Sequence, residues 1–138
     1  MSVVITDKGF GADDLNVAFV ALGEAANSVA ALDVPSDAEL SDLDAHLKAD
    51  VIRVDFPSAA DGRGFTIARQ LRLKGFQGRL RARGHVIADQ YAMARRSGFD
   101  EVEISDELAQ RQPEDQWLFR ANWEQHGYQN RLRAKAAD

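Results

Sequence analysis

A glycine-bounded arginine offers the clearest binding chemistry in this chain. The segment Asp61-Gly62-Arg63-Gly64 follows a predicted strand and opens a predicted helix. Unpaired backbone N–H groups at a helix start can hold an oxyanion, and glycines let the anion approach closely. Arg63 could add a bidentate clamp, although neither the P-loop pattern nor a complete GxGxxG fingerprint is present. The segment predicts either an anion site at Gly62, Arg63 and Gly64 or a tight turn in which Asp61 caps the helix.

A second loop, Gly84-His85-Val86, is expected at the same edge of the sheet and precedes Asp89 and Gln90. His85 could shuttle a proton near neutral pH, with Asp89 orienting it or capping the helix. Gln90 is a further candidate for anion binding. No HxH, HExxH or GxSxG spacing occurs, which argues against a metal site and a serine nucleophile. If the chain catalyses a reaction, the candidate acids or bases are Asp55, Asp61 and Asp89.

The composition restricts the possible chemistry further. The 138 residues contain no cysteine, which excludes disulfides, thiolate-bound zinc, cysteine-ligated iron–sulfur clusters and cysteine nucleophiles. No flavin or nicotinamide signature is present, so the sequence indicates no particular cofactor. No apolar run approaches the roughly 18 residues of a membrane span, and no signal peptide opens the chain. We therefore expect a single cytoplasmic domain over residues 1–138, with no membrane partner.

The charge is distributed unevenly along the chain. The formal net charge is -5, yet residues 53–96 carry nine arginines and one lysine against three acidic residues. Residues 1–52 carry two lysines against ten acidic residues, and residues 97–138 carry five basic residues against nine acidic ones. The acidic flanks oppose nucleic-acid binding, which needs a basic field. The pattern predicts internal charge pairing or a site for a small anion.

Repeated strand–loop–helix units define the expected fold. Strands are predicted at 51–56, 79–83 and 101–105, with helices over about 63–74 and 87–96 between them. Gly75-Phe76 and Gly98-Phe99 end the two helices in the same way, as a glycine cap followed by an apolar contact. Strands that alternate with helices imply right-handed crossovers and a parallel sheet. We expect these three strands to be adjacent and parallel.

Each of these strands has one apolar face and one charged face. Val54, Leu80 and Ile104 lie on the apolar side, whereas Arg81 and its odd-numbered neighbours lie on the other. Strands covered by helices on both sides are usually apolar throughout. The pattern therefore predicts an α/β fold with helices mainly on one side, like part of a (β/α) barrel. The alternative is a doubly wound, three-layer α/β fold. Arg81, on the charged face, is a second candidate cation for the anion site.

The ends of the chain carry weaker signals. Strands are expected at 3–5 and 29–34. Asp13 or Asp14 could cap a helix that ends near Gly23 or Ala26, and leucine spacing predicts a helix over 36–48. A C-terminal helical tail over 113–138 holds both tryptophans. The tail could dock on its own core or on a second copy, and we expect a homodimer through this tail or through the polar sheet face.

Two motifs resemble a known family. The stretch at 55–64 follows the pattern DFPxxxDGRG, and residues 89–100 follow DQ…RRxGFD. They resemble a bacterial family of unknown function labelled as an oxidoreductase involved in sulfite reduction, over roughly residues 50–105. The resemblance implies a role in assimilatory sulfate reduction, beside sulfite reductase and phosphoadenylyl-sulfate reductase as possible partners. Without cysteine, this chain cannot ligate the cluster of a sulfite reductase through thiolates.

Three functions are consistent with these features. The first is an oxyanion-binding auxiliary protein of sulfate or sulfite reduction, which binds sulfite, sulfate or a sulfonucleotide. The second is an oxidoreductase or another enzyme of sulfite reduction that uses an aspartate as acid or base. The third is a non-catalytic, dimeric interaction module. Only the first two require binding of a small anion, and only the second requires turnover.

Overall fold

Seven strands form one mixed sheet in the computed structural model, which describes residues 2–25 and 29–123. The strands are β1 (Ser2–Thr6), β2 (Gly9–Gly11), β3 (Val20–Ala21), β4 (Ala31–Val34), β5 (Val51–Phe56), β6 (Arg79–Gly84) and β7 (Glu101–Ser105). Their order across the sheet is β2-β1-β7-β6-β5-β4-β3. Strands β3 to β7 are parallel, while β1 runs antiparallel to both β7 and β2. The prediction of adjacent, parallel strands at 51–56, 79–83 and 101–105 is confirmed.

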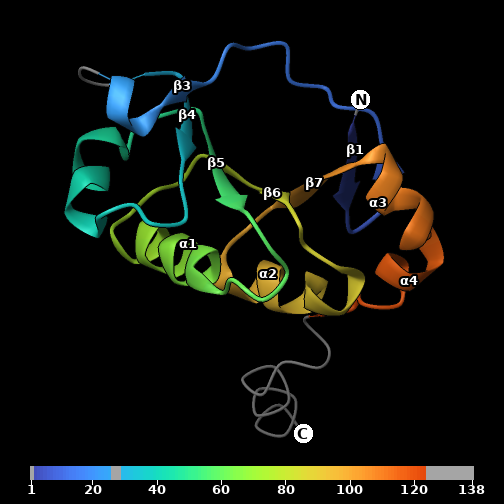
Figure 1. Cartoon of the computed structure of the whole chain (residues 1–138). Coiled ribbons are helices and arrows are strands. Elements are labelled where there is room, and N and C mark those ends of the chain that lie inside the picture. The colour runs from blue at the N-terminus through green and yellow to red at the C-terminus, as the bar shows by residue number, and fades with distance from the viewer. Residues whose placement is uncertain (1, 26–28, 124–138) are drawn as a thin grey trace, which may run out of the picture.

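Helices lie mainly on one face of this sheet. They are α1 (Arg63–Leu73), α2 (Tyr91–Ser97), α3 (Asp106–Arg111) and α4 (Glu114–Leu118), with 3-10 helices η1 (Leu22–Glu24), η2 (Leu40–His46) and η3 (Ala88–Gln90). Helices α1 and α2 lie side by side beneath β5 and β6, and the segment before β3 crosses the opposite face (Figure 1). The arrangement is an α/β fold with helices mainly on one side, as predicted. The sheet is open, and the antiparallel pairing of β1 with β2 and β7 at one side distinguishes it from part of a barrel.

The core lies between the sheet and these two helices. Val54, Leu80 and Ile104 are buried, as their alternation with charged residues predicts. They face the apolar sides of the helices, to which Leu71 of α1 and Tyr91 of α2 contribute. Both predicted glycine caps adopt positive φ angles, 103° at Gly75 and 118° at Gly98. One-sided strands thus position two helices on the apolar face and leave the other face to charged side chains.

The prediction of a helix from Asp13 or Asp14 to about Gly23 or Ala26 is wrong. Residues 12–19 have no regular structure, and they are followed by β3 and η1. Asp13 does accept a hydrogen bond from the Leu15 N–H, at 2.9 Å, as a local turn would. Both carboxylates instead bind arginines of β6. Long-range ion pairs therefore replace the expected helical cap.

The helix expected over 36–48 is shorter and tighter than predicted. Only the 3-10 helix η2 forms there, and Leu43 is its buried leucine. The sequence reading also omitted helix α3, which Ser105 caps by accepting a hydrogen bond from the Leu108 N–H at 3.1 Å. The hairpin partner β2 was likewise not anticipated.

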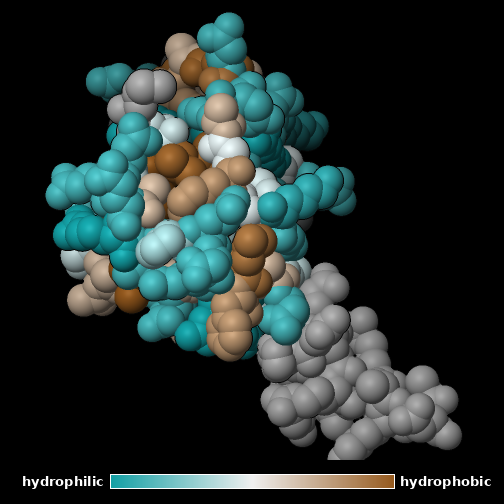
Figure 2. Space-filling view, turned by 90° about the vertical axis from the view of Figure 1, so that its right-hand side faces the viewer, coloured by the Kyte–Doolittle hydropathy of each residue, from teal (hydrophilic) through white to brown (hydrophobic). Residues whose placement is uncertain are grey.

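The described part of the C-terminal segment docks on its own domain. Pro113 precedes α4 as expected, and the Trp117 side chain is buried with its ring edge-on to Tyr91. The Trp123 N–H donates to Asp7 at 3.3 Å. Phe119, in contrast, is 72% exposed. Figure 2 shows hydrophobic surface among mostly hydrophilic side chains at the end of the molecule that carries α3 and α4. The rest of the predicted tail lies outside the described residues.

Helix α1 approaches β5 closely at Gly64. This glycine is buried, and a Cβ atom there would overlap the ring of Phe56. The Phe56 ring is in turn held by Phe65, at a centroid distance of 4.9 Å, and by Phe99 at 5.7 Å. The ring has no free side toward which to move. Gly64 is therefore needed for the packing of α1 on the sheet, whatever else the loop does.

We predict that Gly64→Ala lowers the free energy of unfolding by about 1–3 kcal/mol, the usual cost of overpacking a core. Urea denaturation measures this loss. Gly62→Ala is the matched control, because the nearest atom to a Cβ there is Phe65 Cδ2 at 4.0 Å. The control should stay within about 0.5 kcal/mol of the wild type. Equal losses in both variants would contradict the packing role of Gly64.

Candidate functional site

Charged residues occupy the sheet face opposite the helices, and we call this surface the charged face. Its side chains alternate with the buried apolar ones along β4 to β7. Two rows of register partners result, in which cations and carboxylates meet across the strands: Asp33, Arg53, Arg81 and Glu101 in the first row, and Asp55, Arg83 and Glu103 in the second. Cross-strand opposite charges favour each other. The predicted internal charge pairing is thus present on this face.

Arg81 lies at the centre of the charged face and is fully buried. Its Nε donates to Glu101 at 3.2 Å, and its Nη1 donates to Glu103 at 2.8 Å. Nη1 also donates to Asp13 at 3.0 Å. Burial favours the neutral form, but these carboxylates outweigh it and raise the pKa of Arg81. The guanidinium is therefore held by protein carboxylates on several sides.

The segment 12–19, which we call the strap, covers this central part of the charged face. Asp13 binds Arg81, and Asp14 binds Arg79 at 2.7 Å. Phe19 stacks on the Arg53 guanidinium, with its ring centroid 3.9 Å from Cζ. Hydrogen bonds from Arg79 lower the pKa of Asp14. Burial raises the pKa of Asp13, but hydrogen bonds from the Leu15 N–H and from Arg81 outweigh it, so the net shift is downward.

The predicted glycine loop lies elsewhere, at the carboxyl edge of the parallel strands. Arg63 is exposed and forms two side-chain hydrogen bonds to Asp61, of 3.0 and 2.7 Å, and one to Ser36 of 3.1 Å. These hydrogen bonds hold the pKa of Asp61 well below its usual range. Since Arg63 lies at a strand end and Arg81 in the middle of β6 beneath the strap, the structure does not bring the two predicted cations together.

The other predicted site residues have structural partners near this edge. Gln90 donates to the Ala59 carbonyl at 2.7 Å and accepts from the Ile87 N–H at 3.0 Å, so it joins the loop after β5 to η3. Asp89 pairs with Arg120 at 2.8 Å. His85 is exposed at the end of β6. The structure therefore leaves Asp55 as the remaining carboxylate of the predicted set.

Asp55 and Arg83 form the open end of the charged face. They are register partners on β5 and β6, close to the carboxyl ends of both strands. Arg83 is half exposed and makes one ion pair within the described residues, from Nε to Glu103 at 3.2 Å. Asp55 makes no hydrogen bond or ion pair to any residue that the structure describes. Both side chains are thus free to meet a ligand.

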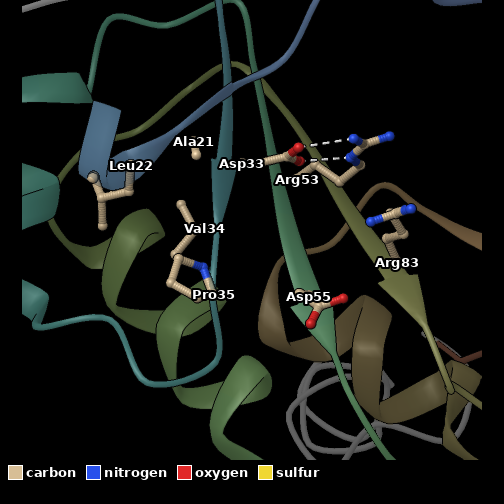
Figure 3. A pocket seen from close by; sticks show the side chains of 9 residues that line it. Ala21, Leu22, Asp33, Val34, Pro35, Arg53, Asp55 and Arg83 are labelled. Carbon is tan, nitrogen blue, oxygen red and sulfur yellow. Dashed lines mark hydrogen bonds and ion pairs between the residues drawn. The ribbon is translucent and has the colours of Figure 1, made fainter. Parts of the chain in front are cut away.

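Two hollows meet at this pair. The first, the apolar hollow, has a volume of about 240 Å³. Ala21, Leu22 and Pro35 lie on one side of it, and Asp55 and Arg83 lie on the other (Figure 3). Its remaining charged residues, Arg53 and Asp33, bind each other through two hydrogen bonds of 2.6 and 2.8 Å.

The second, the edge hollow, has a volume of about 420 Å³ and also includes Asp55 and Arg83. His85, Ser105 and Arg111 contribute further polar groups. Glu103, which borders it, already binds Arg53, Arg81 and Arg83. Ligands of parallel α/β folds gather at the carboxyl ends of strands. The hollow therefore offers Arg83 and His85 to an anion and Asp55 to a hydrogen-bond donor, whereas Arg111 forms an ion pair of 3.9 Å with Glu107, which also lines the hollow.

Arg83 is the site residue that sequence reasoning missed. It lies two positions after Arg81 on the same face of β6, so alternation alone treats the two alike. Their surroundings differ, because the strap covers Arg81 while Arg83 lies at the end of the strand. Its position directly before the Gly84-His85 loop, which was itself a predicted part of the site, could have identified Arg83 from the sequence.

Two further kinds of site can be checked across the described ranges, 2–25 and 29–123. Within them, no three histidine, aspartate or glutamate side chains gather as a potential metal site. None of the helices described there has the length and apolar character to span a bilayer.

Comparison with known proteins gives one match. A family model described as a bacterial protein of unknown function (DUF934) matches residues 31–137. The matched range includes β4 to β7, α1 to α4 and the residues that line the two hollows, except Ser2, Ala21, Leu22 and Gly23. No curated protein and no solved structure matches the chain significantly.

We predict that Arg81→Met destabilises the fold by about 3–5 kcal/mol, the scale for breaking a buried ion pair. The variant would leave Glu101 and Glu103 buried with fewer cationic partners. Thermal and urea unfolding measure the effect. Arg69→Met is the control, because Arg69 is exposed and makes no ion pair or hydrogen bond to the described residues. A loss below 1 kcal/mol for Arg81→Met would show that the charged face contributes little stability.

Proposed function

We propose that this chain, which belongs to the bacterial protein family of unknown function DUF934, binds a small oxyanion at the carboxyl edge of its parallel strands. Candidate ligands are sulfite, sulfate and sulfonucleotides. The resemblance of its motifs to a family linked with sulfite reduction supports a role as an auxiliary protein of assimilatory sulfate or sulfite reduction. In this role the chain binds or delivers an oxyanion beside a sulfite or phosphoadenylyl-sulfate reductase.

This proposal rests mainly on the hydrogen bonding of the Arg83 guanidinium. Its Nε binds Glu103, which orients the guanidinium, while its two terminal nitrogens make no bond to the described residues. A planar guanidinium fixed in this way suits bidentate binding of an oxyanion. Arg111 and His85 border the same hollow. Arg83 therefore supplies the free, oriented cation that the buried Arg81 does not.

The glycine loop contributes as a secondary contact in this proposal. Arg63 binds Ser36, the residue after Pro35, and Pro35 lines the apolar hollow. Asp61 already takes up two of its hydrogen bonds. Because Gly62, Arg63 and Gln90 line neither hollow, we assign them to the surroundings of the site and Arg83 to its centre. Arg81 acts through Glu103, which it shares with Arg83.

A catalytic role for Asp55 is the second candidate. Its carboxylate lacks a protein partner within the described residues and lies beside both Arg83 and the hollow that contains His85. An acid or base needs such access to a substrate proton. Turnover of a bound ligand would distinguish an enzyme from a binding protein.

The homodimer stays a prediction. The exposed side chains of Phe119 and Leu118 in the C-terminal segment could contribute to its interface.

We predict that Arg83→Met weakens oxyanion binding by about 1.5–3 kcal/mol, as expected for a lost hydrogen bond to a charged group. Isothermal titration calorimetry with sulfite, sulfate and adenosine 5′-phosphosulfate measures the affinities. Arg63→Ala should have a smaller effect, because Asp61 already holds its guanidinium. Arg69→Met is the matched control and should bind like the wild type. If none of the three anions binds at millimolar concentration, the proposed function is wrong.

The pathway is tested separately in cells. We expect a deletion strain to grow on sulfide but poorly on sulfate, because the missing protein serves a step that precedes sulfide. Poor growth on sulfite as well would assign that step to sulfite reduction, and normal growth on sulfite would assign it to phosphoadenylyl-sulfate reduction. Complementation with the wild-type gene should restore growth, whereas the Arg83→Met gene should not. Normal growth of the deletion strain on all three sulfur sources would reject the role in sulfur assimilation without affecting the binding result.

A further inference from the structure

We infer that the ligand of this site is an organic oxyanion that carries a hydroxyl or amino group near its anionic end, rather than a bare inorganic anion. The inference rests on the proposed function, because it assumes that Arg83 binds an anion. It follows from two features of the site: the unpaired carboxylate of Asp55 and the apolar wall of the adjoining hollow.

Asp55 disfavours a bare anion. It is the direct register partner of Arg83, and neighbouring strands lie about 4.8 Å apart. An anion bound to Arg83 would therefore lie on the same side of the sheet as the Asp55 carboxylate, and like charges repel. The nearest guanidinium on the same strand, Arg53, binds Asp33 and Glu103 and does not offset this charge. Asp55 strengthens the binding of a ligand only if that ligand carries a hydrogen-bond donor for its carboxylate.

The donor and the anion must belong to the same small ligand. The two side chains point to the same side of the sheet from adjacent strands (Figure 3). They also border both hollows, so a ligand at their junction meets both of them. A hydroxyl or amino group two carbon atoms away from the anionic centre can reach one of these side chains while the anion binds the other. Bare sulfate has no such group.

The apolar hollow determines the rest of the ligand. Ala21, Leu22 and Pro35 form its wall. Among the described residues that line this hollow, Arg53 carries the one guanidinium besides that of Arg83. It gives two hydrogen bonds to Asp33 and one to Glu103, and Phe19 covers its face. A second anionic group would find no free cation there. An apolar or planar group would instead gain by leaving water. Binding sites of this kind combine apolar walls with a few placed polar groups.

The edge hollow holds the anionic end. Arg111 and His85 border it, and Glu103 is neutralised there by three arginines. The site thus determines how the ligand is oriented. Its oxyanion lies toward Arg83 and the edge hollow, its hydrogen-bond donor lies at Asp55, and its apolar part lies toward Leu22. A 2-hydroxyalkanesulfonate has this chemistry, and a phenyl substituent on it supplies the apolar part, so such sulfonates serve as probes.

The first test uses the full-length chain and isothermal titration calorimetry with ethanesulfonate, 2-hydroxyethanesulfonate and sulfate. We expect the wild type to bind the hydroxylated sulfonate at least fivefold tighter than ethanesulfonate. In Asp55→Ala this preference should disappear, while sulfate should bind more tightly than to the wild type because the repulsion is gone. Asp50→Ala is the matched control. It removes an equal charge just before β5, at the other end of the strand, and should change neither ratio.

The second test addresses the apolar wall. We expect 2-hydroxy-2-phenylethanesulfonate to bind at least tenfold tighter than 2-hydroxyethanesulfonate, and Leu22→Ser to reduce that advantage without affecting the binding of 2-hydroxyethanesulfonate. Leu73→Ser is the control, because Leu73 is exposed on α1 and lines neither hollow.

The two proposals fail in different ways. If sulfate binds in an Arg83-dependent manner as tightly as every organic probe, the ligand class inferred here is wrong and the oxyanion site stands. If Asp55→Ala leaves the hydroxyl preference intact, the role of Asp55 is wrong. If no probe binds, both the site and its ligand class are rejected.

Discussion

The burial of the Arg81 guanidinium constrains the whole charged face. A cation removed from water is tolerated only where carboxylates surround it. Glu101 and Glu103 of β7 supply two of them, and Asp13 of the strap supplies a third. Arg53 and Arg79 use the same carboxylates and bring in Asp33 and Asp14, so the inner part of the face becomes a closed network of charges. The strap lies where it does because this network needs its aspartates.

The same network explains why the outer end of the face stays open. Glu103 accepts hydrogen bonds or ion pairs from three arginines, and Arg83 is the outermost of them. One hydrogen bond to a carboxylate that two other arginines also bind orients Arg83 without occupying its terminal nitrogens. Its strand is rigid, since β6 lies between β5 and β7 in the middle of the sheet. A cation held on a rigid element by a supported neighbour is pre-organised for a ligand.

The sequence predicted the parts of this structure that depend on local periodicity. Alternation assigned Val54 and Leu80 to the core and Arg81 to the opposite face, and glycine placement gave the ends of α1 and α2. The prediction from sequence failed where residues far away in the chain determine the contacts of a side chain. Asp13 and Asp14 resemble helix caps, but arginines more than 60 residues away bind both carboxylates. Arg63 resembles an anion clamp within its glycine loop, yet its side chain already binds Asp61.

The stability of the fold does not explain why a carboxylate, Asp55, occupies this position. A half-buried carboxylate loses part of its hydration, and within the described chain no cation compensates it. Arg83 lies between Asp55 and Glu103 in the register and donates to Glu103. A paired or neutral side chain at this position would cost the fold less. Residues that conflict with local stability concentrate where a protein meets its ligand. The unpaired carboxylate and the partly free guanidinium on neighbouring strands therefore mark one site, which accepts a negative charge and a hydrogen-bond donor together.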